Sequence, residues 1–220
     1  MRMRVASGRR PPPPVPLRAL ARRPRVGGKW RVAVTLCLGL SLLACQGAAA
    51  SEDAGLWALL RGGGHVAVMR HASTESGVGD PPGFRLEDCG TQRNLSAAGR
   101  EEASQIGAAF RAHGVPIGRV LSSRWCRCLE TARLAFGRVE PWPPLDSIFG
   151  DRHPVPDQTG EVRTLAGQSP DSGNLILVTH GVNIRALTGV FLSQGEMVVL
   201  TPQGNGAFRI AGRLRPAKSQ

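Results

Sequence analysis

Two histidines and two arginines follow short apolar runs, and this placement is the strongest chemical signal in the chain. Arg70 and His71 directly follow the first run. His180 directly follows another, and Arg127 comes a few residues after a third. The planar fork of an arginine matches phosphate oxygens, and a neutral imidazole can attack phosphorus and hold the phosphoryl group covalently. These residues therefore indicate phosphoryl-transfer chemistry, with a histidine as the nucleophile.

This chemistry requires neither a metal nor a cofactor. The arginines and the second histidine can stabilise the charge that develops on the phosphoryl oxygens. The sequence contains no HExxH motif, no paired CxxC motifs and no Walker glycine loop. We therefore expect no metal site and no cofactor.

The apolar runs predict strands, and the segments between them predict helices. For example, apolar residues recur at helical spacing after Ser96, a typical helix N-cap, and the pattern stops at Gly114. The predicted strands cover residues 65–69, 119–121, 175–178, 197–200 and 207–214. The predicted helices cover residues 53–61, 96–114, 126–136 and 182–192. The predicted loops cover residues 72–94, 141–144 and 150–172.

The alternation of strands and helices predicts both the fold class and the place of the site. It is typical of a three-layer α/β/α sandwich with a central, mostly parallel sheet. In such sheets, ligands bind beyond the carboxyl ends of the strands, so three distant segments deliver polar residues to one rim. Substrate specificity is expected to reside in the loops, residues 72–94 and 141–172.

Four segments resemble the signature motifs of the histidine phosphatase superfamily, which includes acid phosphatases, phosphoglycerate mutases and phosphohistidine phosphatases. Residues 68–72 (VMRHA) resemble its RHG signature, and residues 93–100 (RNLSAAGR) resemble a helix start of that family. Residues 120–132 (VLSSRWCRCLETA) and 178–181 (VTHG) resemble its second arginine motif and its second-histidine motif. The four segments occur in the family's order.

The resemblance implies a role for each matching residue. His71 would be the phosphorylated nucleophile, Arg70 and Arg127 would bind the phosphate, and His180 would be the second histidine of the pocket. Ala72 stands where the family usually has glycine. The implied activity is metal-independent hydrolysis of a small phosphorylated substrate, a phosphomonoester. The alternatives are a phosphohistidine phosphatase, a mutase, or a phosphate-binding protein with a vestigial pocket.

The acid that protonates the leaving group is the least defined part of this interpretation. Many family members carry a glutamate in the middle of the chain, where this sequence has only the nearby carboxylates Asp146 and Asp151. Some phosphohistidine phosphatases manage without this acid, because imidazole is already a good leaving group. Arg93, Arg124 and Ser73 are candidates for substrate binding. Arg93 has the alternative of an ion pair with a neighbouring carboxylate, Glu87 or Asp88.

The basic charge of the chain lies in its first residues. The whole chain has a net charge of +12, but residues 1–45 hold ten Lys or Arg and no Asp or Glu. Residues 46–220 hold eighteen basic and sixteen acidic residues, so their net charge is only +2. No basic stripe is interleaved with aromatic residues, so binding to nucleic acid is not expected.

The first fifty residues predict export. Residues 1–31 form a basic, proline-rich n-region, and residues 32–50 form a signal or lipoprotein segment that precedes a predicted phosphatase domain at 51–220. The apolar run in this segment, residues 32–44, is shorter than the roughly 20 residues that a transmembrane helix needs. The segment ending at Cys45 resembles a bacterial lipobox, which implies lipidation of Cys45. The alternative is ordinary signal cleavage after residues 48–50. The expected location is the periplasm, in soluble form or as a membrane-anchored lipoprotein.

Three cysteines follow the leader. An exported protein meets an oxidising compartment, so a disulfide is expected to join Cys89 to Cys126 or to Cys128. The alternative is that all three are small buried residues. The sequence carries no signal for an oligomeric state.

Overall fold

The computed structural model describes residues 52–77, 79–149 and 155–216. All of them belong to one compact unit, Gln46–Gln220. Within these ranges, no helix is long and apolar enough to cross a membrane. The predicted leader, with Cys45, lies outside the described residues.

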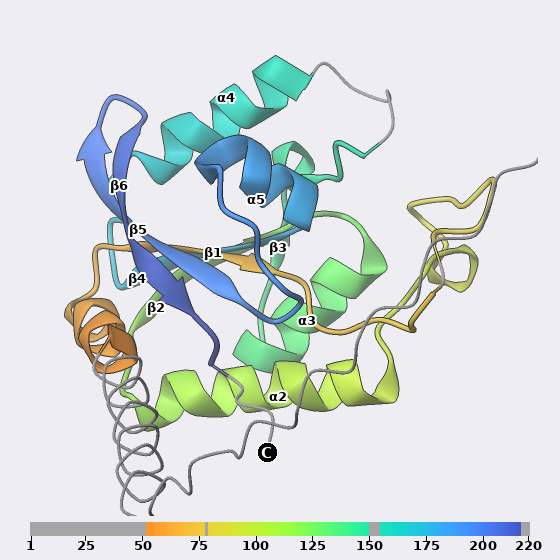
Figure 1. The fold of residues 1–220 in the computed structure, drawn as a ribbon, viewed down its shortest axis with the longest axis horizontal. Helices are drawn as coiled ribbons and strands as arrows, with labels where there is room; N and C mark the ends of the chain where they lie inside the picture. The colour runs from red at the N-terminus through yellow and green to blue at the C-terminus, as the bar shows by residue number, and fades with distance from the viewer. Residues whose placement is uncertain (1–51, 78, 150–154, 217–220) are drawn as a thin grey trace, which may run out of the picture. The chain divides into compact units, whose positions relative to one another are not determined.

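Strand β1 (Val66–Arg70) lies inside a six-stranded sheet with the order β3-β2-β4-β1-β5-β6 (Figure 1). The other strands are β2 (Ile117–Ser122), β3 (Glu140–Pro141), β4 (Asn174–Thr179), β5 (Met197–Gly204) and β6 (Ala207–Leu214). The first four strands run parallel, whereas β5 and β6 add antiparallel pairs on one side. The prediction of a mostly parallel sheet is confirmed.

Helices cover both faces of this sheet, as the three-layer prediction requires (Figure 1). A helix at 52–62, α2 (Ala97–Ala112) and α3 (Cys126–Phe136) share one apolar cluster with the sheet. The opposite cluster contains side chains of α4 (Val155–Ala166) and α5 (Gly181–Thr188). Successive side chains of a strand point to opposite faces, so both clusters draw on β1.

The alternation within β1 explains why its sequence is apolar from Val66 to Met69. Ala67 and Met69 belong to the cluster beneath α2 and α3, while Val66 and Val68 belong to the cluster beneath α4 and α5. A strand that is covered on both faces has no solvated side, so β1 has no polar residue before its last one, Arg70.

Two predicted boundaries are wrong. Residues 150–172 were expected to be a loop, but α4 occupies much of this range. The expected helix at 182–192 ends earlier, because Gly189 adopts a positive φ of 75° and caps α5 at Thr188. Residues 190–192 then turn back toward the site.

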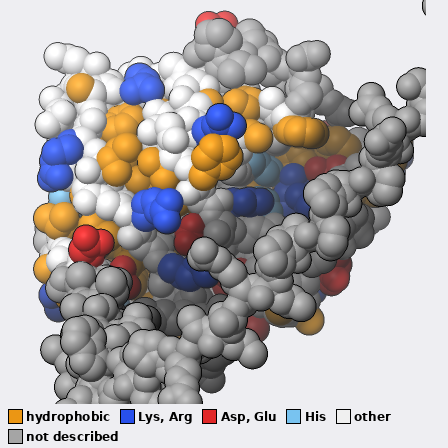
Figure 2. Space-filling view, in the orientation of Figure 1, with side chains coloured by type: hydrophobic (Ala, Val, Ile, Leu, Met, Phe, Trp, Pro, Cys, Tyr) orange, Lys and Arg blue, Asp and Glu red, His pale blue; other side chains and the backbone are white. Residues whose placement is uncertain are grey.

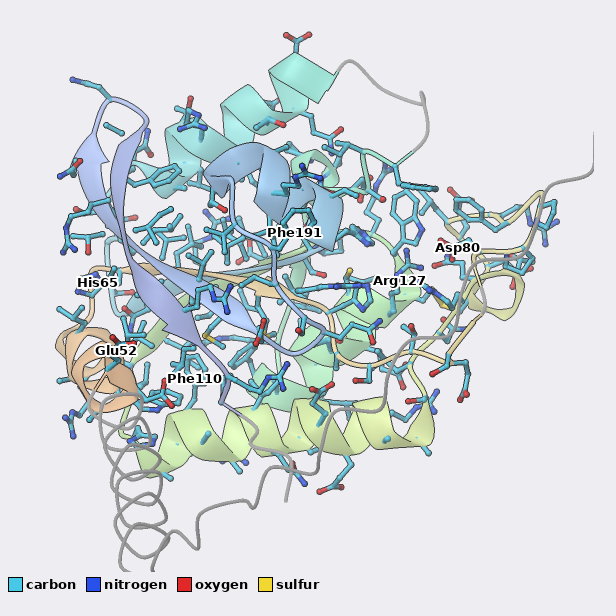
Figure 3. All side chains as sticks on the ribbon, viewed as in Figure 1. Glu52, His65, Asp80, Phe110, Arg127 and Phe191 are labelled. Carbon is cyan, nitrogen blue, oxygen red and sulfur yellow. A yellow bond between two sulfur atoms is a disulfide. The ribbon has the colours of Figure 1, made fainter. Side chains whose placement is uncertain are left out.

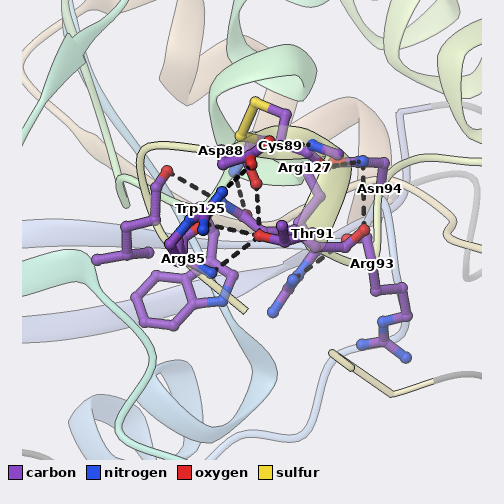
Figure 4. Close-up of a disulfide and its surroundings, with 12 residues drawn as sticks. Arg85, Asp88, Cys89, Thr91, Arg93, Asn94, Trp125 and Arg127 are labelled. Carbon is purple, nitrogen blue, oxygen red and sulfur yellow. Dashed lines mark hydrogen bonds and ion pairs between the residues drawn. A yellow bond between two sulfur atoms is a disulfide. The ribbon is translucent and has the colours of Figure 1, made fainter. Parts of the chain in front are cut away.

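A disulfide joins Cys89, in the short 3₁₀ helix η1 (Cys89–Thr91), to Cys126, the first residue of α3 (Figure 4). The sequence analysis allowed either Cys126 or Cys128 as the partner of Cys89, and in the structure the partner is Cys126. Cys128 is free and buried. The disulfide therefore fastens the loop 72–94 to the residue that precedes Arg127.

Candidate active site

The carboxyl ends of β1, β4 and β2 meet at one edge of the sheet. Strand β4 pairs in parallel with both of the others. His71, His180 and Ser123 each directly follow the last residue of one of these strands. The rings of His71 and His180 lie edge to face, with centroids 5.6 Å apart. Figure 2 shows histidine atoms beside arginine atoms in a hollow of the surface.

His71 has the protonation state that a nucleophile needs. Its Nδ1 lies 2.8 Å from the carbonyl oxygen of Ala72, which can only accept a hydrogen bond. Nδ1 therefore carries the proton, and the lone pair of the neutral ring is on Nε2. Burial, with smaller repulsion from Arg127, lowers the pKa of His71 to about 3, although the Ala72 hydrogen bond opposes this shift. The imidazole is thus neutral over the physiological range.

The backbone around His71 is held on three sides. The His71 N–H donates to the carbonyl of Thr179 at 3.0 Å, and the Ala72 N–H donates to Oγ1 of Thr131 at 3.1 Å. A Cβ atom built on Gly99 would lie 1.8 Å from the carbonyl oxygen of Ser73, so the start of α2 packs directly on this segment. These contacts hold the backbone that carries the imidazole.

His180 is the second buried histidine, and it accepts one hydrogen bond at Nδ1 and donates another at Nε2. Nη2 of Arg127 lies 3.5 Å from its Nδ1, and a guanidinium can only donate, so Nδ1 accepts. Nε2 then carries the proton and donates to Oγ of Ser123 at 2.9 Å. Ser123 in turn donates to Oδ1 of Asp146 at 3.3 Å. Burial and repulsion from Arg127 keep the pKa of His180 well below its ordinary value.

Arg127 is buried in the centre of this group, on the first turn of α3 (Figure 3). Nη1 donates to Oδ1 of Asp80 at 2.8 Å and to the carbonyl of Arg93 at 3.2 Å. Nη2 donates to Oδ2 of Asp80 at 3.1 Å. The Nε–H is buried and has no acceptor among the described residues. A buried donor without an acceptor costs about 1–3 kcal/mol, so it indicates a place for an anionic ligand.

Arg70 offers a second donor of the same kind. Its Nη1 donates to the carbonyl of Leu192 at 2.9 Å, but its buried Nε–H has no acceptor within the described part of the chain. Gly181 lies close by, since a Cβ built there would be 3.4 Å from this Nε. Burial, together with the charges of Arg93 and Arg127, lowers the pKa of Arg70. The site therefore gathers positive charge around His71.

Asp146, a proposed proton donor, is buried, and both oxygens of its carboxylate already accept hydrogen bonds. Its Oδ1 accepts from the backbone N–H of Arg124 at 2.8 Å as well as from Ser123, and its Oδ2 accepts from Nε of Arg124 at 2.7 Å. Its backbone carbonyl accepts from the side chain of Asn183 on α5. This set of contacts suits a residue that orients Ser123 and Arg124. Asp151, the other candidate acid, lies outside the described residues.

The remaining predicted residues lie near the site in different ways. Arg93 contributes its backbone to the site, since its carbonyl accepts from Arg127 and its N–H donates to Asp80. Asp88 pairs with Arg85 across the loop. The hydroxyl of Ser73 donates to Glu102 of α2 at 2.8 Å. Ser73 therefore joins the loop to a helix.

The sequence interpretation missed Asp80 and the linking role of Ser123. Asp80 lies in a loop rich in glycine and proline, where no periodicity marks a side chain as buried or exposed. Ser123 was present in a predicted motif, but its partners come from segments far away in the chain. Among the described residues, no group of three or more His, Cys, Asp or Glu is arranged to hold a metal ion.

Comparisons with known proteins agree with this geometry at the level of the fold. No protein-family model matches the chain. No curated protein matches it. Among solved structures, the protein histidine phosphatase SixA in complex with tungstate superposes with a TM-score of 0.51 at 17% identity, over 69% of this chain and 97% of that chain. Rv3214 from Mycobacterium tuberculosis gives a TM-score of 0.49 at 17% identity, over 66% of this chain and 94% of that chain. The likeness to SixA shows a common fold.

Proposed function

We propose that this chain, which has the fold of the histidine phosphatase superfamily, hydrolyses a phosphomonoester through a covalent phosphohistidine on His71. The observation that carries the proposal is the neutral, buried imidazole of His71 beside two buried guanidinium N–H donors, on Arg70 and Arg127, that have no acceptor in the described chain. A nucleophile and an anion-binding site thus occur together. SixA, whose fold this chain shares, was solved with the oxyanion tungstate bound.

The reaction follows from these positions. The substrate phosphate binds to Arg70 and Arg127, whose charges stabilise the transferring phosphoryl group. Nε2 of His71 attacks phosphorus, and the phosphoryl group is held on the imidazole. The bond to the leaving oxygen breaks, and this oxygen takes a proton from water and departs as an alcohol. Water then cleaves the nitrogen–phosphorus bond and releases phosphate. His180 and Ser123 hold Arg127 in place through their hydrogen bonds. No step in this scheme requires a metal.

A phosphohistidine phosphatase is the second candidate, and the engagement of Asp146 favours it. The carboxylate of Asp146 is occupied by Ser123 and Arg124. An imidazole leaving group departs from phosphorus more readily than an alkoxide, so a phosphohistidine substrate needs less acid assistance. The predicted leader adds the proposal that the enzyme acts outside the cytoplasm, as a periplasmic or lipid-anchored protein.

Trapping the intermediate tests the proposed function. The full-length protein is incubated briefly with phosphate esters labelled with ³²P, denatured in alkali, and analysed for acid-labile label on His71. We expect label and turnover in the natural protein and neither in His71→Ala. His113→Ala is the matched control, because His113 stacks on Trp57 at the far end of α2. Turnover that survives in His71→Ala would refute the proposal. Phosphate binding without turnover would favour the vestigial pocket, and transfer of label to a second substrate would favour a mutase.

A further inference from the structure

The terminal nitrogens of Arg127 are already occupied by groups of the protein itself. Nη1 donates to Asp80 and to the carbonyl of Arg93, and Nη2 donates to Asp80 and lies near Nδ1 of His180. The two terminal nitrogens form the edge of a guanidinium that binds a carboxylate or a phosphate with two parallel hydrogen bonds. In this structure the carboxylate of Asp80 takes that edge. Only the Nε–H of Arg127 is left without an acceptor in the described chain.

Asp80 is more exposed than the arginine it pairs with. The side chain of Arg127 is 4% exposed and that of Asp80 is 20% exposed. The edge of the guanidinium is thus buried, while the carboxylate that occupies it is in part accessible to solvent. Figure 3 labels both residues, Asp80 in the loop that follows β1 and Arg127 on α3.

Asp80 is held in place as an anion. Partial burial acts to raise its pKa, but the hydrogen bonds from Arg127 and from the backbone N–H of Arg93 outweigh this effect, and the pKa is lowered. The Arg93 N–H lies 3.0 Å from Oδ1 of Asp80. At neutral pH, Asp80 is thus a carboxylate that accepts the same hydrogen bonds that a phosphate would accept.

We propose that Asp80 is a specificity-determining residue: it occupies the bidentate edge of Arg127, so a substrate phosphate that binds at the free Nε–H gains this edge only by displacing Asp80. This inference rests on the proposed function, because it assumes that Arg127 binds phosphate. A dianionic phosphomonoester brings two negative charges to the arginines, so it gains more than a single carboxylate and can exchange with it. A monoanion, such as a phosphodiester or a free carboxylate, gains no more than Asp80 already gives and is excluded.

Binding of inorganic phosphate to the full-length protein, measured by calorimetry at neutral pH, tests the exchange. Asp80→Asn keeps the shape and the acceptor for the Arg93 N–H but removes the charge. We expect it to bind phosphate about tenfold more tightly, which corresponds to about 1.4 kcal/mol. Asp80→Glu keeps a carboxylate and should remain close to the natural protein. Asp88→Asn is the matched control, since Asp88 pairs with Arg85 in the same loop.

Competition between a free carboxylate and phosphate is a second measurement, and it does not depend on how tightly Asp80→Asn binds phosphate. In Asp80→Ala the edge of Arg127 is vacant, so added formate should compete with phosphate there. The natural protein should be insensitive to the same formate concentration. Melting temperatures of each variant, with and without phosphate, show whether the variant is folded and whether it binds.

Each contrary result has a separate meaning. If Asp80→Asn binds phosphate equally or more weakly, Asp80 only orients Arg127 and the exchange is refuted. Equal sensitivity of Asp80→Ala and the natural protein to formate would refute it independently. If the natural protein neither binds phosphate nor hydrolyses an ester, the proposed function itself fails.

Discussion

Nδ1 of His71 lies 2.8 Å from the carbonyl oxygen of Ala72, the next residue in the chain. The backbone, which is the same for any residue at position 72, thus sets the tautomer of the imidazole and leaves the lone pair on Nε2. The tautomer of His71 is therefore fixed by local structure, and burial is the main cause that lowers its pKa to about 3.

The lowered pKa of His71 predicts a loss of stability in acid. The pKa of the folded protein, about 3, lies below the ordinary value of 6.5, so the unfolded chain binds the proton first as the pH falls. Between pH 6.5 and 3, the free energy of unfolding of the natural protein should fall relative to that of His71→Gln, by up to about 1.4 kcal/mol per pH unit. Urea denaturation at several pH values measures this difference. The prediction is contradicted if the free energy of unfolding depends on pH in the same way in both proteins. The control variant His113→Gln should show the same pH dependence as the natural protein.

Ser123→Ala should weaken both the fold and the reaction. It removes the oxygen that accepts from His180 and donates to Asp146, and it leaves the buried Nε2–H of His180 with only the weak acceptor Sγ of Cys128, 3.6 Å away. We expect a loss of about 1–3 kcal/mol in unfolding free energy. We also expect kcat to fall about tenfold, equivalent to about 1.4 kcal/mol in the barrier. Ser104→Ala, on the exposed face of α2, is the control. Unchanged kcat in Ser123→Ala would show that the orientation of His180 does not limit the reaction.

The close approach at Gly99 predicts a severe effect from a single methyl group. In Gly99→Ala, the new Cβ would overlap the carbonyl oxygen of Ser73, so the segment after His71 must move. We expect a loss of about 1–3 kcal/mol in stability together with a loss of turnover. Gly160→Ala, inside α4, has nothing within 4 Å of the new Cβ and should stabilise the protein by up to about 1 kcal/mol. Thermal melting distinguishes the two, and equal shifts in melting temperature would contradict the packing argument.

The disulfide between Cys89 and Cys126 predicts a redox-dependent stability. The bond spans 37 residues, and closing a loop of that length stabilises the folded state by about 4 kcal/mol in the chain-entropy model. Reduction should therefore lower the denaturation midpoint of the natural protein but not that of Cys89→Ser. Peptide mapping under non-reducing conditions should recover the linked pair. The thiol of Cys128, whose pKa burial raises to about 12, should react with alkylating agents only after unfolding.

Much of the fold follows from local pattern. Residues 66–69 of β1 and 175–178 of β4 are apolar throughout because both faces of these strands are covered, and that pattern is visible in the sequence. His71 and His180 directly follow these strands, so their meeting at one edge follows from parallel pairing. Helix α4 was missed because Gly160 and nearby proline interrupt its pattern, although proline at a helix start is favourable.

The interior of the site was less predictable than its location. The bond between Asp80 and Arg127 joins residues 47 positions apart, and nothing in the local composition selects Asp80 over other loop carboxylates. The engagement of Asp146 likewise depends on where β2 and α5 place Ser123 and Asn183. Such contacts arise from tertiary packing, which short-range patterns do not encode.

The position of β1 in the sheet also sets the order in which the molecule can be assembled. Its hydrogen-bonded neighbours are β4 and β5, which are both synthesised long after it. A nascent chain that ends before residue 174 holds His71 on a strand without a neighbour, still surrounded by water. The pairing of strands that lie so far apart in the sequence is slow compared with the formation of local contacts. The dry environment of the imidazole is therefore created only when roughly the last fifth of the polypeptide, from β4 onward, folds back, and a prematurely terminated product has no such environment.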